Sequence, residues 1–193
     1  MKGQLRLLSG LKIDSPKGTK TRPTTSIVRE ALINLLGQKL LNCNWLDLYS
    51  GSGVVACEAI DRGAKNVLAI ERDFRTAKVC NYNLSYITKF QKGQKHVEVI
   101  ADDVIGTLDK GFSQYSQFLE TKSSFDIAYI DPPYRSNVYT SVLEKLMKGN
   151  WLAKDSLVIC EHTPKTEIEV NNEWEIKSRR KYGNSALLIL SPP

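Results

Sequence analysis

Short apolar runs alternate along most of the chain with longer segments whose apolar residues recur at helical spacing. Five runs predict buried strands, at residues 45–49, 67–71, 97–101, 125–131 and 157–161. The segments between them predict helices at 53–62, 74–87, within 103–120 and at 138–147. Strands that alternate with helices are typical of an α/β fold, so we expect a doubly wound, mostly parallel sheet.

The two ends of the chain depart from this alternation. Residues 4–13 predict a short hairpin around Ser9-Gly10, and 24–36 predict an amphipathic helix capped by Thr24 or Thr25. At the other end, 174–181 and 185–190 predict two strands that add antiparallel neighbours at one edge, giving seven strands in all. We therefore expect an N-terminal extension over 1–40, packed on a core domain over 41–193.

Composition adds limits. Of 193 residues, 41% are hydrophobic and 25% charged, which is ordinary for a soluble globular protein. No apolar segment approaches the roughly eighteen residues of a membrane span, and the first residues do not resemble a signal peptide. The cysteines lack C-x-x-C spacing and only two histidines occur, so we expect neither a metal site nor disulfides. The expected state is a cytoplasmic monomer.

The charge is unevenly distributed. The net charge is +6, and residues 1–44 carry all of the excess, whereas the remainder is balanced. A basic arm beside a neutral domain indicates a polyanionic partner, most simply nucleic acid, with a solubilising segment as the alternative. The candidate contacts on this arm are Arg6, Lys12, Lys17, Lys20, Arg22 and Arg29.

The end of the 125–131 run carries the most informative motif, Asp131-Pro132-Pro133-Tyr134. Two prolines cannot continue a sheet ladder, so the strand stops and a rigid turn presents a carboxylate, carbonyls and an aromatic ring. Such a corner suits a planar group with an NH2, because Asp131 and a carbonyl can accept its two N–H bonds while Tyr134 stacks on it. An ordinary strand-ending turn is the alternative.

A second motif follows the first predicted strand. Gly51-Ser52-Gly53-Val54-Val55-Ala56 fits a dinucleotide-binding pattern, and Glu71 lies twenty residues beyond Gly51, where an acid grips ribose hydroxyls. This leaves a nicotinamide-dependent dehydrogenase open. Asp47 and the Asp102-Asp103 pair favour S-adenosylmethionine instead, because carboxylates can meet its amino group and its adenine. Helix capping is the alternative for Asp102-Asp103.

Together these motifs resemble those of class I S-adenosylmethionine-dependent methyltransferases that modify exocyclic amines. The segment Arg22-Pro23-Thr24-Thr25-Ser26-Ile27-Val28-Arg29-Glu30 resembles the signature of the RsmD family, bacterial 16S rRNA (guanine-N2)-methyltransferases, and the likeness spans essentially the whole chain. The chain departs from the commonest pattern at Tyr49-Ser50. The glycines that shape the turn remain.

The resemblance implies a role for each matched position. Cofactor contacts would come from Asp47, Tyr49, Ser50, Gly51, Gly53, Glu71, Arg72, Asp102, Asp103 and Asp131. The catalytic corner would be Asp131, Pro132, Pro133 and Tyr134. It also implies rRNA as partner, naked or in an assembling subunit, and no metal.

The corner by itself would accept other amines. A DNA adenine or cytosine methyltransferase and a protein-glutamine methyltransferase therefore stay open as alternatives. The basic arm favours nucleic acid, and the small size favours RNA, because no segment is left for a DNA target-recognition domain.

Overall fold

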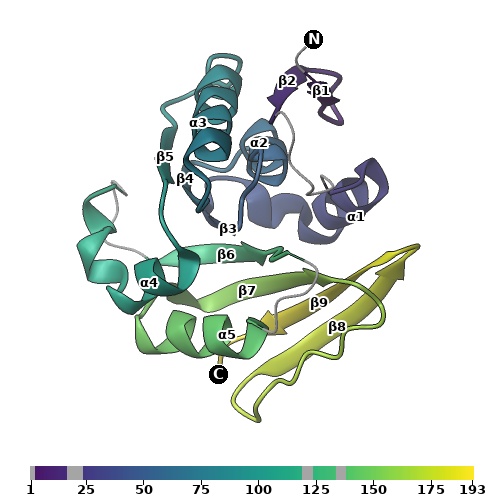
Figure 1. Cartoon of the computed structure of the whole chain (residues 1–193), viewed down its shortest axis with the longest axis vertical. Helices are drawn as coiled ribbons and strands as arrows, with labels where there is room; N and C mark the ends of the chain where they lie inside the picture. Colours follow the sequence, from purple (N-terminus) through teal and green to yellow (C-terminus); the bar gives the residue numbers. More distant parts are fainter. Residues whose placement is uncertain (1–2, 17–23, 119–123, 134–137) are drawn as a thin grey trace.

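Seven strands form one sheet in the order β5-β4-β3-β6-β7-β9-β8 in a computed structural model, whose described residues are 3–16, 24–118, 124–133 and 138–193 (Figure 1). Strands β5, β4, β3, β6 and β7 are parallel, and β9 is antiparallel to both β7 and β8. The strands are β3 (Asn44–Leu48), β4 (Asn66–Ile70), β5 (His96–Ile100), β6 (Phe125–Ile130), β7 (Leu152–His162), β8 (Glu175–Tyr182) and β9 (Ser185–Ser191).

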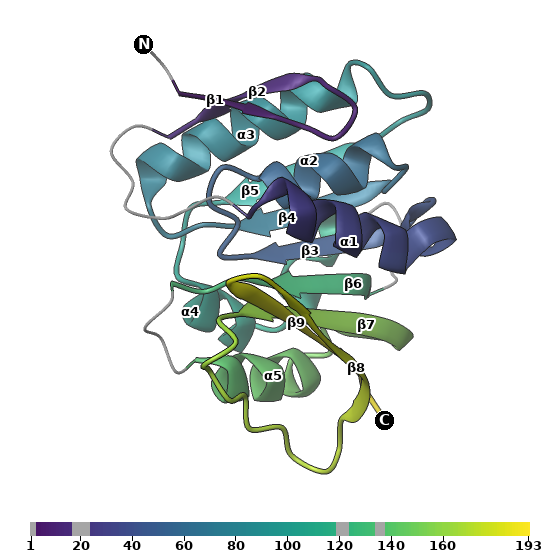
Figure 2. The ribbon, with the colours of Figure 1, turned by 90° about the vertical axis from the view of Figure 1, so that its right-hand side faces the viewer.

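Helices cover both faces of this sheet (Figures 1 and 2). One apolar cluster packs α1 (Ser26–Leu36), α2 (Val54–Asp61) and α3 (Phe74–Thr88) against one face. A second packs α4 (Val104–Asp109) and α5 (Tyr139–Lys148) against the other. Short 3-10 helices are η1 (Gly37–Leu40), η2 (Phe112–Gln114) and η3 (Ser116–Phe118).

The continuous apolar runs follow from this layering. Successive side chains of a strand point to opposite faces, so a strand covered on both sides must be apolar throughout. In β3, Trp45 joins the first cluster while Leu46 and Leu48 join the second. The predicted doubly wound sheet, with its antiparallel edge, is confirmed.

The N-terminal hairpin, β1 (Gly3–Arg6) and β2 (Lys12–Ser15), lies over α3 (Figure 2). Leu7 and Ile13 are buried in the same cluster as α1, α2 and α3. Thr25 caps α1 by accepting a hydrogen bond from the Val28 amide, which resolves the choice left open between the two threonines. The domain boundary at residue 40 stays a prediction.

The largest difference from the predicted elements is in β7. The strand begins at Leu152, earlier than the predicted 157, and its register against β6 is irregular between Phe125 and Ile127. Lys154 and Asp155 are exposed there, which hid the strand from an argument based on apolar runs. Within the described residues, no helix has the length and apolar character needed to cross a membrane.

Candidate functional site

The predicted site residues converge on the carboxyl edge of the sheet. Chain order reverses between β3 and β6, because the crossover through α2 leads from β3 to β4 on one side while β6 pairs with β3 on the other. In open α/β sheets, ligands bind beyond the strand ends at such a reversal. Asp47 lies near the end of β3, Glu71 directly follows β4, and Asp131 directly follows β6.

The loop after β3 turns sharply into α2. Gly51 and Gly53 adopt positive φ angles of 53° and 73°, and Tyr49 has a φ of 63°. A Cβ added at Gly53 would lie 2.6 Å from Cys80 Sγ, whereas one added at Gly51 would meet nothing within 4 Å. Gly53 therefore allows close packing of the loop on α3, and Gly51 faces open space where a ligand can approach the backbone.

Glu71 fixes this loop to the end of β4. Its Oε2 accepts a hydrogen bond from the Gly51 amide at 3.0 Å, and its Oε1 accepts one from the Asp73 amide at 2.9 Å. Asp73 in turn caps α3. The predicted ribose-gripping carboxylate is thus placed beside the glycine loop, in a fixed orientation.

Asp47 has a structural role, and its contact with the cofactor stays a prediction. Its carboxylate is buried and accepts a hydrogen bond from the Ala56 amide in the first turn of α2, at 3.1 Å. Burial raises its pKa to about 7, and nearby Glu71 contributes in the same direction. A buried carboxylate with a raised pKa is stabilised in its charged form by a neighbouring cation.

Asn83 on α3 was not predicted as a site residue. Its buried side chain accepts a hydrogen bond from the Asp14 amide and donates to the carbonyls of Asp14 and Ser52, each at 2.9 Å. It thereby joins β2 of the hairpin to the glycine loop. An asparagine on the otherwise apolar face of the 74–87 helix was the available signal, because a buried amide needs partners.

Of the remaining two predicted acids, Asp103 caps α4 and Asp102 directly precedes it. Asp103 accepts a hydrogen bond from the Gly106 amide, and Asp102 pairs with Lys110 at 2.9 Å. Both are accessible to solvent. Asp103 also acts on Tyr49: burial raises the pKa of the Tyr49 hydroxyl to about 12, the Asp103 charge adds to this, and Arg72 opposes it. Tyr49, Arg72 and Asp103 therefore lie near one another at the carboxyl edge of the sheet.

The Asp131 corner follows β6 as predicted. Thr24, just before α1, donates its hydroxyl to Asp131 Oδ2 at 3.4 Å, and the Asp131 amide donates to the Leu48 carbonyl at 3.4 Å. Burial raises the pKa of Asp131 well above its usual range, and Glu161 and Asp47 add to the rise. Pro132 is buried and Pro133 is exposed. Tyr134 lies outside the described residues.

Behind this corner is a second carboxylate that was not predicted. Glu161 on β7 is buried; the Tyr129 hydroxyl donates to its carboxylate, and the Tyr139 hydroxyl donates to its backbone carbonyl at 2.6 Å. A cavity of about 10 Å³ lies between Asp131 and Glu161, too small for a purine. The signal was an acid inside the apolar run 157–161.

The carboxylates fit a cationic cofactor. Asp47 lies near the end of β3, and Glu71 and Asp131 directly follow the neighbouring strands β4 and β6. Burial is the main cause of the raised pKa values of Asp47 and Asp131, and repulsion from nearby carboxylates adds to it. A positive group between them would relieve that repulsion. S-adenosylmethionine, expected from the sequence, carries such charges on its amino group and its sulfonium.

The basic arm divides into different parts. Arg6 and Lys12 are exposed and directly opposite each other on β1 and β2, where like charges destabilise a hairpin in the absence of a partner. Lys17, Lys20 and Arg22 lie outside the described residues.

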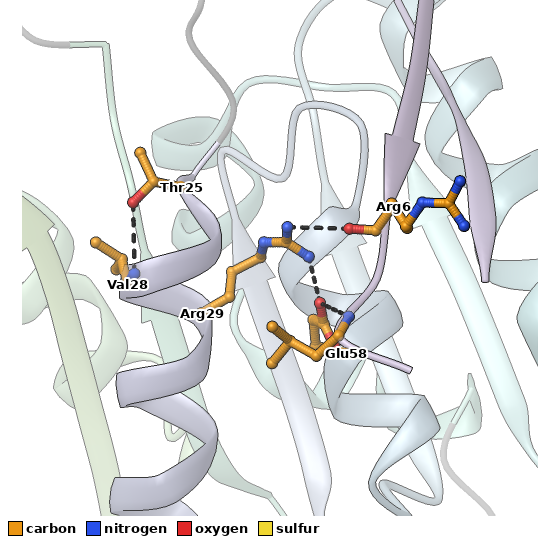
Figure 3. A network of polar contacts seen from close by, with 6 residues as sticks. Arg6, Thr25, Val28, Arg29 and Glu58 are labelled. Atoms are coloured by element: carbon orange, nitrogen blue, oxygen red, sulfur yellow. Dashed lines mark hydrogen bonds and ion pairs between the residues drawn. The ribbon is translucent and has the colours of Figure 1, made fainter. Parts of the chain in front are cut away.

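Arg29 is the exception on this arm. Its side chain is buried, pairs with buried Glu58 and donates to the Arg6 carbonyl at 3.1 Å (Figure 3). Its assignment as an RNA contact is therefore corrected: Arg29 holds α1 against α2 and the hairpin. The arm's count of basic residues gave no sign of this, because charge summed along a segment does not distinguish buried from exposed side chains.

The chain is similar to known proteins over nearly its whole length. A family model described as conserved hypothetical protein 95 matches residues 3–191. The ribosomal RNA small subunit methyltransferase D of Buchnera aphidicola (subsp. Baizongia pistaciae) is 30% identical, over 83% of this chain and 76% of its own. The protein of that name from Escherichia coli K12 is 27% identical, over 95% and 88%. The solved structure of Escherichia coli yhhF is 26% identical, with a TM-score of 0.78 over 98% of both chains.

Proposed function

Because the chain belongs to the RsmD family, whose model is described as conserved hypothetical protein 95, we propose that it transfers a methyl group from S-adenosylmethionine to the N2 amine of a guanine in small-subunit ribosomal RNA. The observation that carries the proposal is the Asp131 corner at the reversal point of the sheet, beside carboxylates suited to a cationic methyl donor.

Cofactor binding is assigned to the glycine loop and the acids around it. Asp47 faces the amino group, Glu71 the ribose and Asp103 the adenine. The remaining residues assigned to the cofactor site are Tyr49, Ser50, Arg72 and Asp102. Gly51 leaves room for close approach. When bound, the cofactor supplies an electrophilic methyl group attached to a sulfonium.

The guanine is assigned to the open side of the corner, because the cavity behind Asp131 is too small for it. The Asp131 carboxylate and the Pro132 carbonyl accept the two N–H bonds of the amine, which orients the nitrogen lone pair. Positioning of this kind contributes about 7–11 kcal/mol to lowering a barrier. Tyr134 stacks on the base, which contributes about 1–3 kcal/mol.

The raised pKa of Asp131 bears on the proton that the amine loses. A carboxylate with a raised pKa is a stronger base than an ordinary one, so Asp131 is suited to accept this proton at neutral pH. Thr24 holds one carboxylate oxygen through its hydroxyl. A cationic group next to Asp131 lowers the pKa of this carboxyl, so cofactor binding prepares it as an acceptor.

The test measures labelled methyl transfer to 16S rRNA, assembling small subunits, DNA and protein extracts, followed by nucleoside analysis. We expect N2-methylguanosine in the rRNA. With saturating cofactor, Asp131→Ala should reduce transfer by about 10²–10⁴-fold, while cofactor binding, measured by calorimetry, is weakened but still detected. Asp109→Asn, an exposed acid at the end of α4, is the matched control and should transfer normally.

Three results would contradict the proposal. Label in adenine, cytosine or glutamine would assign another acceptor, and undiminished transfer by Asp131→Ala would remove the corner from the chemistry. Full transfer by that variant once the cofactor is saturating would limit Asp131 to cofactor binding.

The proposal extends to the setting of the enzyme. An rRNA substrate is consistent with a cytoplasmic enzyme, and the four cysteines are free and buried. We further propose that the protein acts as a monomer and without a metal. Light scattering tests the first, and transfer in the presence of EDTA tests the second.

A further inference from the structure

A second basic surface borders the same edge of the sheet, on the side away from the hairpin. The end of β7, the loop after it, the second half of β8 and the start of β9 enclose an open groove of about 410 Å³. Its polar walls are His162, Lys165, Thr166, Arg179, Arg180 and Lys181. None of these residues belongs to the basic N-terminal arm.

The charges of this groove are not neutralised by the protein. Arg179, Arg180 and Lys181 are exposed, and within the part of the chain that the structure describes none of them pairs with a carboxylate. Lys177, earlier on the same strand, does pair, with Glu175. One carboxylate, Glu167, is present on the groove wall against four cations.

Edge strands often carry charges that prevent pairing with other sheets, and β8 is an edge strand. Charges placed anywhere along the edge strand would prevent such pairing. It does not account for three consecutive cations gathered at one end of the strand, against a groove. Arg179 and Lys181 share one face of the strand and lie about 7 Å apart at a rise of about 3.3 Å per residue, the length over which a nucleic-acid strand presents two or three phosphates.

The groove is continuous with the catalytic corner. His162 and Thr166 line both the groove and the small cavity beside Asp131. In the strand order, β5 and β4 lie on one side of β6 and its corner, and β8 lies at the far edge on the other side. The hairpin packs on α3, near β4 and β5 (Figures 1 and 2). The hairpin and the groove therefore flank the corner on opposite sides.

We propose that this groove binds the phosphate backbone of the RNA strand next to the target nucleotide. The inference rests on the proposed function and adds a specific path for the substrate: the strand contacts the hairpin on one side of the corner and β8 on the other. The cations hold the flanking phosphates, so that the base between them is presented to Asp131. Unstacked loops fit this path better than a duplex does.

The test compares two triple variants with equal loss of charge. Arg179→Gln/Arg180→Gln/Lys181→Gln removes the groove cations. Arg62→Gln/Lys89→Gln/Lys92→Gln removes three exposed cations near the ends of α2 and α3, at the opposite edge of the sheet. The affinity for a single-stranded 16S rRNA fragment is measured by fluorescence anisotropy over a series of salt concentrations.

The affinity of the groove variant for the fragment should fall by on the order of ten-fold or more. The slope of log binding constant against log salt concentration should fall in magnitude by about 2, whereas the control stays close to wild type. In transfer assays the KM for RNA should rise while kcat is retained, because the groove does not touch the reacting atoms. Equal losses in both triple variants, or none in either, would overturn the inference.

Two further readouts separate the possible failures. Thermal unfolding and cofactor binding should be unchanged in the groove variant; if the variant unfolds, the single charge reversal Arg180→Glu replaces it, with the same expected loss of RNA affinity. If the wild type binds RNA through the groove but transfers no methyl to it, the proposed function fails and the inference about RNA binding stands.

Discussion

In the glycine-loop half of the site the carboxylates already accept hydrogen bonds from backbone amides: Asp47 from Ala56, Glu71 from Gly51 and Asp73, and Asp103 from Gly106. In the corner half, Asp131 accepts one from the Thr24 hydroxyl at 3.4 Å, and its pKa is raised by burial and, in addition, by the carboxylate of Glu161. The first half is held in place by its own backbone. The second half is electrostatically strained and suited to a ligand that donates N–H bonds.

The difference indicates a division of labour. Carboxylates that accept backbone bonds keep their orientation with or without a ligand, which favours binding of one rigid cofactor. A carboxylate with few partners keeps its capacity for the substrate. Substitutions in the first half should therefore change stability and cofactor affinity, whereas substitutions in the second should change transfer and its pH dependence.

The largest expected effect concerns the pH dependence of stability at Asp47. Its pKa is about 7 in the folded protein and about 3.8 when exposed, so the folded state holds the proton more tightly. Stability is then highest at low pH and falls as pH rises through this window, by up to about 4 kcal/mol. Asp47→Asn should remove that fall, of which about 2–3 kcal/mol lies between pH 5 and pH 8, the two conditions compared by urea unfolding.

The cofactor provides a second measurement on Asp47. In the wild type it should raise the melting temperature more at pH 8 than at pH 5, because it stabilises the charged carboxylate. In Asp47→Asn this difference should disappear. Parallel stability curves for the variant and the wild type would show that Asp47 does not titrate in this range, and the comparison of the two halves would lose its main support.

A smaller effect is expected at Asn83. Asn83→Ala removes the hydrogen bonds that its side chain makes to the backbone of Asp14 and of Ser52, which should cost about 2–3 kcal/mol in the free energy of unfolding. Cofactor affinity should also fall, since the glycine loop is loosened. Asn81→Ala, on the exposed face of the same helix, is the control and should stay within about 0.5 kcal/mol. Equal effects of the two variants would contradict the role of Asn83 in joining β2 to the glycine loop.

The smallest expected effects are shifts in the pH profile of transfer. Transfer should fall at low pH as Asp131 takes up a proton. Glu161→Gln removes a charge that raises the pKa of Asp131, so the acidic limb should move to lower pH; Thr24→Val removes a hydrogen bond that lowers it, so the limb should move to higher pH. Shifts in the same direction in both variants would exclude Asp131 as the group that titrates.

The sequence was sufficient for the fold, because strands buried on both faces give continuous apolar runs and helices give spaced ones. It also located Asp131, since a double proline ends a strand wherever it occurs. Partners could not be predicted. Glu161 and Thr24 lie 30 residues after and 107 residues before Asp131 in the chain, and only the register of β6 with β7 and the path into α1 bring them together.

Charge along the chain was the least reliable guide. The basic excess of residues 1–44 directed attention to the N-terminal arm, yet Arg29 is buried against Glu58. The run 177–181, with four cations in five residues, was only a weak candidate from the sequence, because a charge run is usually a solvated face; its position beside the corner depends on β9 inserting between β7 and β8. Burial and strand order decide which charges a substrate meets, and neither is a local property of the sequence.

The single amide of Asn83 has a practical consequence for how the N-terminal arm can be studied. Because it joins β2 to the glycine loop, cutting the arm away would also remove the support of the loop on which the cofactor is expected to rest. A truncated protein that no longer binds RNA would thus say little about the arm itself. Neutralising Arg6 and Lys12 in the intact hairpin separates recognition from architecture, since both side chains are exposed.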